Sequence, residues 1–354
     1  MRHLQFFLYP ASLLYGFFMQ IRNLLFDWNI LKSTQFNLPL ISVGNLSVGG
    51  SGKTPQVEYL LRLLSEKFKT ATLSRGYGRR SSGFLLATDH TDVKLIGDEP
   101  RQISKKFGNI HVAVDEKRTR GVQHLLDQFP DLNVVILDDS YQHRWVKPGL
   151  SILLSDYYHL YYEDHVIPTG RLREFSCGSK RADIIIITKT PKILSPITRR
   201  RITESIRPKS HQQLFFSYIH YLAPLPIFKT VMQDIPTKWS FILLFSGVAD
   251  DELLKEHLRR YCNDLTSIRF GDHHDYSLKD IIRIKEKYDT LPSQKKIAIT
   301  TEKDVMRLQE PELQEILKTF PVYFIPIEVE FHEPDKQIFD QAILNYVKEN
   351  KRDG

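Results

Sequence analysis

The chain has 354 residues, of which 42% are hydrophobic and 26% charged, and its formal net charge is +7 at pH 7. This balance excludes a disordered or collagen-like protein, and the length suffices for two or three domains with buried cores. Two cysteines are too few for a disulfide framework and predict a reducing compartment without structural zinc. The positive charge favours anionic partners such as nucleotides or phospholipid head groups, whereas the short, scattered basic clusters argue against nucleic acid.

Residues 1–31 predict an amphipathic helix. Residues 4–21 carry no formal charge, but Pro10 and Arg22 interrupt the apolar segment, so a membrane span is not expected. From Ser12 onward, apolar residues recur at helical spacing and form one stripe, made of Leu13, Leu14, Phe17, Phe18, Ile21, Leu24, Leu25 and Trp28. Such a stripe packs either into the protein core or into the head-group zone of a membrane, and its aromatic content favours the membrane surface.

After this helix, short apolar runs alternate with amphipathic segments. We expect strands at 36–43, 70–73, 110–114, 134–137, 151–154 and 184–188, and helices at 54–68, 98–107, 117–128 and 195–206. The alternation predicts an α/β fold over 32–207, with a parallel sheet covered by helices. The proline-rich stretch 208–239 predicts a linker, with a strand-like run that suits a hairpin. A second, smaller α/β domain is expected over 240–354.

The expected strand that ends at Val43 runs into a glycine-rich loop followed by a helix. Glycines let backbone N–H groups surround an oxyanion, and the helix N-terminus adds a favourable dipole. Lys53 would reach the outer phosphates of a nucleotide, and the Thr54 hydroxyl would complete a Mg²⁺ shell. An ordinary glycine-rich turn is the alternative, and Ser47 stands where the usual pattern has glycine. The strand–loop–helix context nevertheless favours a P-loop NTPase-type parallel sheet covered by helices. Its nucleotide site is formed by Ser47, Val48, Gly49, Gly50, Ser51, Gly52, Lys53 and Thr54.

A second apolar run, residues 133–137, ends in Asp138 and Asp139. A P-loop needs such an acidic partner for its metal ion. Because the carboxyl ends of parallel strands gather at one edge of a sheet, Asp138 and Lys53 are expected to converge there. A strand followed by a simple acidic turn is the alternative.

With these features in place, the chain resembles the tetraacyldisaccharide 4′-kinases, the lipid A 4′-kinases of Gram-negative bacteria. The resemblance runs from about Val43 to Leu308 and rests on seven motifs in order: GGSGKTP (49–55), SRGYG (74–78), GDEP (97–100), DDSYQH (138–143), PTGRLRE (168–174), DHHDY (272–276) and TTEKD (300–304). The family usually has threonine where Ser51 stands and glycine where Ser140 stands.

The resemblance implies transfer of the γ-phosphoryl group of ATP to the 4′-hydroxyl of a tetraacylated glucosamine disaccharide 1-phosphate. It implies ATP and Mg²⁺ as cofactors, and a peripheral position on the cytoplasmic face of the inner membrane. The expected partners are the lipid A disaccharide 1-phosphate and the membrane surface, and no obligate protein partner is inferred.

The resemblance also assigns residues to roles. Asp98 and His273 are implied as the pair that removes the acceptor proton, although His274 leaves the choice of histidine open, and Asp98 would also suit a helix cap. The remaining catalytic residues are Lys53, Asp138, Asp139 and Arg173. The implied metal ligands are Thr54, Glu99 and Asp138. The implied substrate-binding residues are Arg118, Gln142, His143, Arg173 and Glu174.

Two other functions fit part of the pattern. A membrane-associated P-loop nucleotide switch would carry a base-reading N/TKxD motif, and the sequence Thr188-Lys189-Thr190 begins like one but lacks the aspartate. A P-loop kinase of a soluble metabolite would have no use for the aromatic N-terminal helix.

Overall fold

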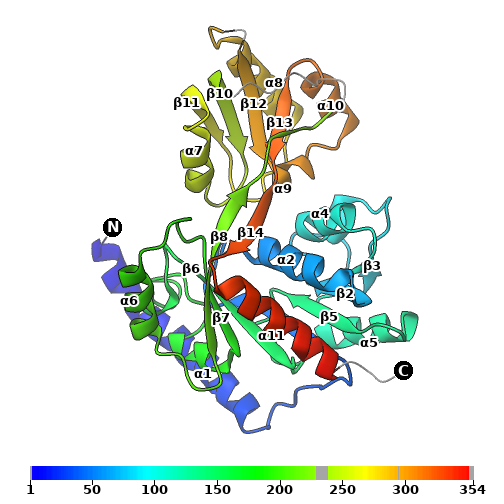
Figure 1. Cartoon of the computed structure of the whole chain (residues 1–354), viewed down its shortest axis with the longest axis vertical. Coiled ribbons are helices and arrows are strands. Elements are labelled where there is room, and N and C mark those ends of the chain that lie inside the picture. Colours follow the sequence, from blue (N-terminus) through cyan, green and yellow to red (C-terminus); the bar gives the residue numbers. More distant parts are fainter. Residues whose placement is uncertain (1, 229–237, 294, 351–354) are drawn as a thin grey trace. The chain divides into compact units, whose positions relative to one another are not determined.

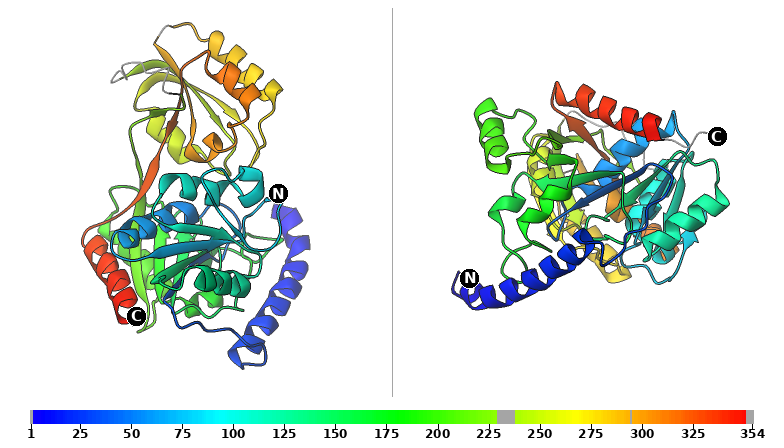
Figure 2. Two further views of the ribbon diagram at one scale, coloured as in Figure 1. Left: turned by 90° about the vertical axis from the view of Figure 1, so that its right-hand side faces the viewer. Right: turned by 90° about the horizontal axis from the view of Figure 1, so that it is seen from below.

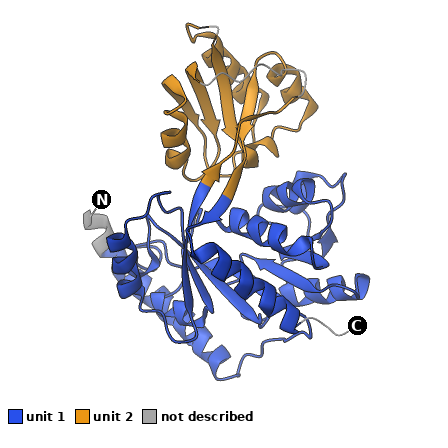
Figure 3. Ribbon diagram, in the orientation of Figure 1, with its two compact units in different colours: residues 1–219, 329–354 blue, residues 220–328 orange. Residues whose placement is uncertain are grey.

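The computed structural model describes residues 2–228, 238–293 and 295–350. The chain divides into two compact units, which Figure 3 distinguishes by colour. The first comprises residues 1–219 and 329–354, and the second comprises residues 220–328. Each unit is described by itself below.

The first unit is built on a sheet that has nine strands among the described residues, in the order β14-β8-β7-β6-β1-β5-β2-β4-β3. The strands from β8 to β4 pair in parallel, whereas the short β3 pairs antiparallel with β4. Their bounds are β1 Leu40–Asn45, β2 Thr70–Ser74, β3 Leu85–Leu86, β4 His111–Val114, β5 Val134–Asp138, β6 Leu150–Asp156, β7 Ile184–Thr188, β8 Gln213–Tyr221 and β14 Ile327–Phe331. From β1 the chain continues into β2, which lies two positions away in the sheet, and it later returns to the other side of β1 as β6. The strand order therefore reverses at β1, and in open parallel sheets ligands bind beside the loops at such a reversal.

Helices cover both faces of this sheet (Figure 1). On one face, α2 (Lys53–Ser65), α4 (Asp98–Lys106) and α11 (Asp335–Asn350) pack over the central strands and share one apolar core. On the other face, α5 (Arg118–Gln128) and α6 (Pro196–Ile206) bury their own apolar clusters. The central strands are buried on both sides, as expected for a helix-covered parallel sheet, and the predicted fold class is confirmed.

The second unit holds a five-stranded sheet in the order β11-β10-β12-β13-β9, counted over the described residues. Its strands are β9 Leu225–Pro226, β10 Trp239–Ser246, β11 Cys262–Arg269, β12 Lys296–Thr301 and β13 Val322–Ile325. Its helices are α7 Glu252–Leu258, α8 Leu278–Asp289, α9 Glu302–Val305 and α10 Pro311–Leu317. Apolar clusters on both faces of the sheet give this unit its own core.

The unit boundaries differ from the predicted domains 208–239 and 240–354. Residues 213–221 form β8 of the first sheet, and the final helix α11 packs on that sheet too. The apolar residues after Pro321 look like one strand in sequence, but Pro326 separates β13 of the second unit from β14 of the first. The sequence does not show that the residues before and after Pro326 join different sheets. Residues 229–237 of the predicted linker lie outside the described residues.

The N-terminal helix α1 (Arg2–Asp27) runs along one side of the first unit (Figure 2). Its polar face points inward, because Ser12 and Asn23 are only 3% and 4% exposed. Its apolar stripe points outward, with Phe17 57% and Phe18 62% exposed. The stripe is therefore not part of the core. No helix in the described part of the chain is long and apolar enough to cross a membrane.

Candidate active site

The phosphate-binding loop connects β1 to α2, as the sequence predicts. Gly49 and Gly52 have φ angles of 103° and 81°. These left-handed conformations are costly for residues with side chains, which explains the glycines. Gly52 is also the N-cap residue of α2, so the helix begins without a side-chain cap. A helix N-terminus of this kind binds phosphate through its N–H groups and its dipole.

The PTGRLRE motif lies directly beside this loop. The Val48 N–H donates to the Arg171 carbonyl at 2.8 Å, and the Arg173 N–H donates to the Leu46 carbonyl at 2.7 Å. These two backbone bonds hold Arg173 next to the phosphate-binding loop, although the residues are more than a hundred positions apart in the sequence.

Three charged side chains meet at the carboxyl edge of the sheet. Lys53 Nζ lies 3.7 Å from Asp139 Oδ1, and Arg173 Nη1 lies 3.1 Å from the same oxygen. Burial acts to raise the pKa of Asp139, but the charges of Lys53 and Arg173, with the hydrogen bond from Arg173, outweigh it and hold this pKa below its usual value. Asp139 is therefore ionised, and its charge holds two cations at the edge where phosphate groups would lie.

Asp138, the last residue of β5, is 2% exposed, and its Oδ1 is buried without a hydrogen-bond partner. Burial, followed by the negative charges of Glu99 and Asp139, raises the pKa of Asp138 to about 7. An orphaned carboxylate oxygen close to a second acid suits a divalent cation. Among the described residues, no group of three or more His, Cys, Asp or Glu side chains is placed to hold a metal alone. Magnesium sites beside P-loops fit this pattern, since most of their ligands are phosphates and waters.

Arg118 lies deeper than a substrate-binding residue would. It is 2% exposed, and its guanidinium donates to the carbonyls of Asp115 at 3.0 Å and Asp138 at 3.2 Å. Burial lowers the pKa of Arg118 to about 10, even though Asp138 and Asp139 oppose this change. The geometry favours a role in holding the end of β5, and contact with substrate stays a prediction.

Gln142 and Glu174 are joined to each other and to Arg173. Gln142 Nε2 donates to Glu174 Oε1 at 3.2 Å, while Arg173 Nη1 donates to Gln142 Oε1 at 3.4 Å. Glu174 is 2% exposed. These hydrogen bonds occupy both side chains within the protein, and their contact with substrate stays a prediction.

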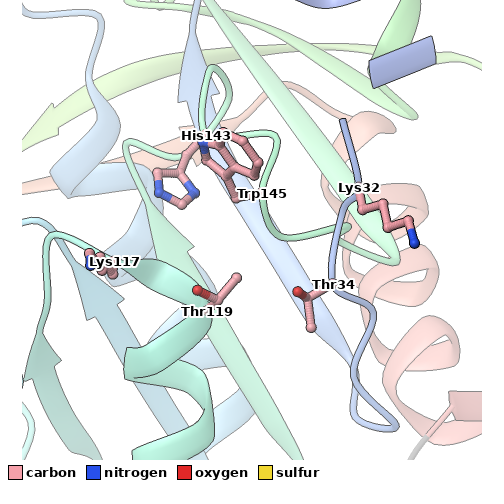
Figure 4. A pocket seen from close by; sticks show the side chains of 6 residues that line it. All are labelled: Lys32, Thr34, Lys117, Thr119, His143 and Trp145. Atoms are coloured by element: carbon pink, nitrogen blue, oxygen red, sulfur yellow. The ribbon is translucent and has the colours of Figure 1, made fainter. Parts of the chain in front are cut away.

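His143 lies on a pocket of about 300 Å³ (Figure 4). Burial, with the nearby charge of Arg118, lowers the pKa of His143 to about 4, so its imidazole is neutral at neutral pH. The other lining residues come from the segment after α1, the start of α5 and the loop after β5: Lys32, Thr34, Lys117, Thr119 and Trp145. The Lys117 ammonium, the hydroxyls of Thr34 and Thr119 and the Trp145 ring can together bind a phosphorylated sugar, whereas the Lys32 ammonium points away from them (Figure 4).

Asp98 is the first residue of α4, whose N-cap is Gly97 without a side-chain cap. The alternative that Asp98 caps this helix is therefore wrong. In the first turn of a helix a carboxylate also benefits from the helix dipole.

His273 belongs to the second unit and has a φ angle of 57°. Its Nε2 lies 3.1 Å from Lys303 Nζ, and its Nδ1 lies 3.3 Å from Arg307 Nη2. The neighbouring His274 Nε2 instead lies 3.1 Å from Asp280 Oδ2, in the capping box of α8. This favours His273 over His274 as the reactive histidine. Asp98 and His273 lie in different units, and their pairing stays a prediction.

Two residues that contact the phosphate-binding loop are missing from the predicted site. Thr188 Oγ1 donates to the Ser51 carbonyl at 2.9 Å, and Lys189 Nζ donates to the Gly50 carbonyl at 2.5 Å. Lys189 also pairs with Asp156 at 2.8 Å. The sequence marks Thr188 and Lys189 only as the start of the incomplete N/TKxD motif at the end of β7, and it gives no sign that they contact the loop.

A parallel sheet with a phosphate-binding loop, an acidic residue at the end of the adjacent strand and a second α/β unit defines a P-loop nucleotide-binding protein. Residues 4–348 match the family described as tetraacyldisaccharide-1-P 4′-kinase (LpxK). The chain therefore belongs to this family, as the motifs indicate.

Individual relatives agree with this assignment. A tetraacyldisaccharide 4′-kinase of Bacteroides thetaiotaomicron is 44% identical over 98% of this chain and 94% of its own length. One from Flavobacterium johnsoniae is 45% identical, over 97% of each chain. The crystal structure of LpxK from Aquifex aeolicus in complex with ATP is similar to this chain with a TM-score of 0.72 and 28% identity, covering 97% of this chain and 99% of the other.

Proposed function

We propose that this protein transfers the γ-phosphoryl group of ATP to the 4′-hydroxyl of a tetraacylated glucosamine disaccharide 1-phosphate. The observation that supports it most is the meeting of Lys53, Asp139 and Arg173 beside the phosphate-binding loop. Phosphoryl transfer requires positioning and charge neutralisation more than covalent participation by the protein, and this arrangement supplies both.

In the proposed step, the 4′-oxygen forms a bond to the γ-phosphorus while the bond from that phosphorus to the β,γ-bridging oxygen breaks, and ADP leaves. The hydroxyl proton passes to the pair formed by Asp98 and His273. A positioned base of this kind contributes about 10²–10⁴ in rate. If the two residues act as one unit, single-turnover rates of Asp98→Asn, His273→Ala and the double variant will be strongly non-additive. Independent, multiplying losses would remove the pair from the mechanism.

Mg²⁺ is the proposed metal, held by Thr54, Asp138 and Glu99 together with nucleotide phosphates. Bound there, it would neutralise charge on the phosphate oxygens. The unpartnered Asp138 oxygen supports this assignment. Lys53 would neutralise the γ-phosphate, and Arg173 would stabilise the transferring group through its planar guanidinium.

We assign the phosphorylated sugar head group to the pocket lined by Lys32, Lys117 and His143. The Lys117 ammonium matches an anionic group, and Trp145, which is 44% exposed, offers a ring face to a sugar. The neutral state of His143 suits hydrogen bonding to a hydroxyl without adding charge.

We further propose that the outward face of α1 lies in the head-group zone of the inner membrane, on its cytoplasmic side. A soluble protein gains nothing by burying the polar face of a helix and exposing Phe17 and Phe18, whereas a lipid surface would cover these rings. The acyl chains of the proposed substrate lie in such a surface. The same exposed face argues against a soluble metabolite as acceptor.

The direct test incubates the purified protein with Mg-ATP and the lipid A disaccharide 1-phosphate in detergent micelles. We expect the lipid to gain the mass of one phosphate, and we expect Lys53→Ala to abolish the reaction while its unfolding temperature stays close to that of the wild type. A folded Lys53→Ala protein with turnover within a few-fold of the wild type would contradict the P-loop assignment.

A further inference from the structure

A continuous set of polar side chains connects α1 to the catalytic edge of the sheet. Asn23 Nδ2 donates to Glu174 Oε2 at 2.6 Å, and Gln142 Nε2 donates to Glu174 Oε1 at 3.2 Å. Arg173 in turn donates to Gln142 Oε1 and to Asp139. We call Asn23, Glu174, Gln142 and Arg173 the polar seam.

Burial makes the partners of Glu174 important. Asn23 is 4% exposed and Glu174 is 2% exposed. A buried carboxylate is costly unless donors satisfy its oxygens. Glu174 Oε1 accepts hydrogen bonds from Gln142 and from Arg181, the latter at 2.8 Å. Among the described side chains, Asn23 is the one that donates to Glu174 Oε2. The orientation of Glu174 therefore depends on a residue of the surface helix.

A second set of contacts holds the same loop to the same turn of α1. Arg22 Nη2 donates to the Gln142 carbonyl at 3.0 Å, and Arg144 Nη1 donates to the Asn23 carbonyl at 2.7 Å. Arg144 also pairs with Asp27 at 2.6 Å. α1 thus holds the Gln142 backbone directly through Arg22, in addition to holding its side chain through Glu174.

An isolated membrane anchor would have no need for these contacts. A helix that served only to attach the protein could pack through apolar or small residues, as Gly16 does against Phe175. Instead, Asn23 on the inward face of α1 begins a series of hydrogen bonds that continues through Glu174 and Gln142 to Arg173.

We propose that Asn23 is a positioning residue for phosphoryl transfer: through Glu174 and Gln142 it sets the geometry of Arg173 against Asp139, so that α1 is part of the catalytic apparatus as well as a surface helix. This inference rests on the proposed kinase activity.

The test exchanges donor and acceptor across the pair. Asn23→Asp places a second carboxylate against Glu174, with no donor between the two. Glu174→Gln alone leaves a pair of amides that Asn23 can satisfy by turning its own amide, so this change serves as the partner of Asn23→Asp. The double variant restores one donor facing one acceptor and keeps Oε1 as acceptor for Gln142 and Arg181. We expect Asn23→Asp to lower kcat about ten-fold or more, and the double variant to recover most of that loss.

Rates are normalised to the fraction of protein that binds ATP, so that misfolded protein is not counted. Asn23→Ala, which removes the donor without adding charge, serves if Asn23→Asp does not fold. Ser12→Ala is the matched control, because Ser12 is also buried on the inward face of α1 but bonds to Thr169 instead of the polar seam. We expect its kcat to stay within about two-fold of the wild type.

Comparing lipid in detergent micelles with lipid in vesicles separates a positioning role of Asn23 from a role in membrane attachment. Positioning predicts the same loss of kcat with lipid in detergent micelles and in vesicles. A loss confined to vesicles would mean that Asn23 matters only for attachment, and a double variant no better than the worse single variant would mean that the pair is not coupled; either result overturns the inference. A wild type that phosphorylates no lipid would instead overturn the proposed function.

Discussion

Arg173 Nη1 lies 3.1 Å from Asp139 Oδ1, and the Arg173 backbone is bonded to Leu46 of the phosphate-binding loop. The sequence separates these groups widely, yet the fold brings them to one edge of the sheet. Because Lys53 shares the same carboxylate, the edge carries two cations that are held by one ionised acid. Two cations held in this way suit the negative charge of a transferring phosphoryl group, which is why we assign them to the proposed reaction.

Replacing Arg173 tests this arrangement. Arg173→Ala should lower kcat about 10²-fold, and Arg173→Lys should lower it less, because an ammonium keeps the charge but loses the planar fork. Arg171→Ala is the matched control, since Arg171 is exposed and contributes its backbone carbonyl to Val48. Steady-state kinetics of the three variants decide the matter. Greater sensitivity at Arg171 would contradict the assignment of Arg173.

The outward face of α1 should control attachment to vesicles. Phe17→Asn combined with Phe18→Asn removes two exposed rings, each worth about 1.5–3 kcal/mol when buried, so co-sedimentation with anionic vesicles should fall at least ten-fold. Ile193→Asn with Ile197→Asn is the control, because these residues are 91% and 81% exposed elsewhere on the first unit. Equal binding by both double variants and the wild type would place the attachment site elsewhere.

Lys189 should support nucleotide binding through the phosphate-binding loop. Lys189→Met removes the ammonium that bonds to the Gly50 carbonyl and to Asp156, so we expect the KM for ATP to rise about ten-fold with little change in the KM for lipid. The exposed Lys192, changed to Met, controls for loss of charge. An unchanged KM for ATP in Lys189→Met would show that the contact does not shape the loop.

Asp138 should lower the stability of the nucleotide-free protein at neutral pH. Its folded pKa of about 7 lies above the ordinary value of 3.8, so ionisation opposes folding at any pH above 3.8, most strongly above 7. Its contribution therefore becomes less unfavourable as the pH falls from 7 toward 3.8. Asp138→Asn should raise the unfolding temperature without nucleotide, most at or above pH 7, while losing activity and the stabilisation by Mg-ATP. A lower unfolding temperature for Asp138→Asn at neutral pH would contradict this.

Much of the fold follows from local pattern. The apolar runs that become β5 and β7 are short, β-branched and bounded by polar residues, and α2 has a clear apolar face. The strand β11 (Cys262–Arg269) was not predicted, because its burial is uneven and its sequence includes Asn263 and Asp264. The strand β14 was hidden because it continues the apolar run of β13 past Pro326.

The site was predictable where one segment carries the chemistry. The loop at 47–54 and the acids after β5 are local signals with a known geometry. The contacts of Lys189 with Gly50 and of Asn23 with Glu174 join segments more than a hundred residues apart, and no spacing rule in the sequence predicts them. Periodicity found the two faces of α1, but it could not show that the polar face would be the buried one.

The most direct test of the proposed function compares the fate of the γ-phosphoryl group with and without a 4′-hydroxyl. The wild-type protein is given γ-labelled ATP and either the disaccharide 1-phosphate or its 4′-deoxy analogue, and the label is followed into lipid and into inorganic phosphate. We predict that the label enters the first lipid at the 4′-position, confirmed by phosphorus NMR, and that it enters the deoxy analogue not at all. Release of inorganic phosphate at the same rate with either lipid, without labelled product, would contradict a kinase and indicate a nucleotide switch.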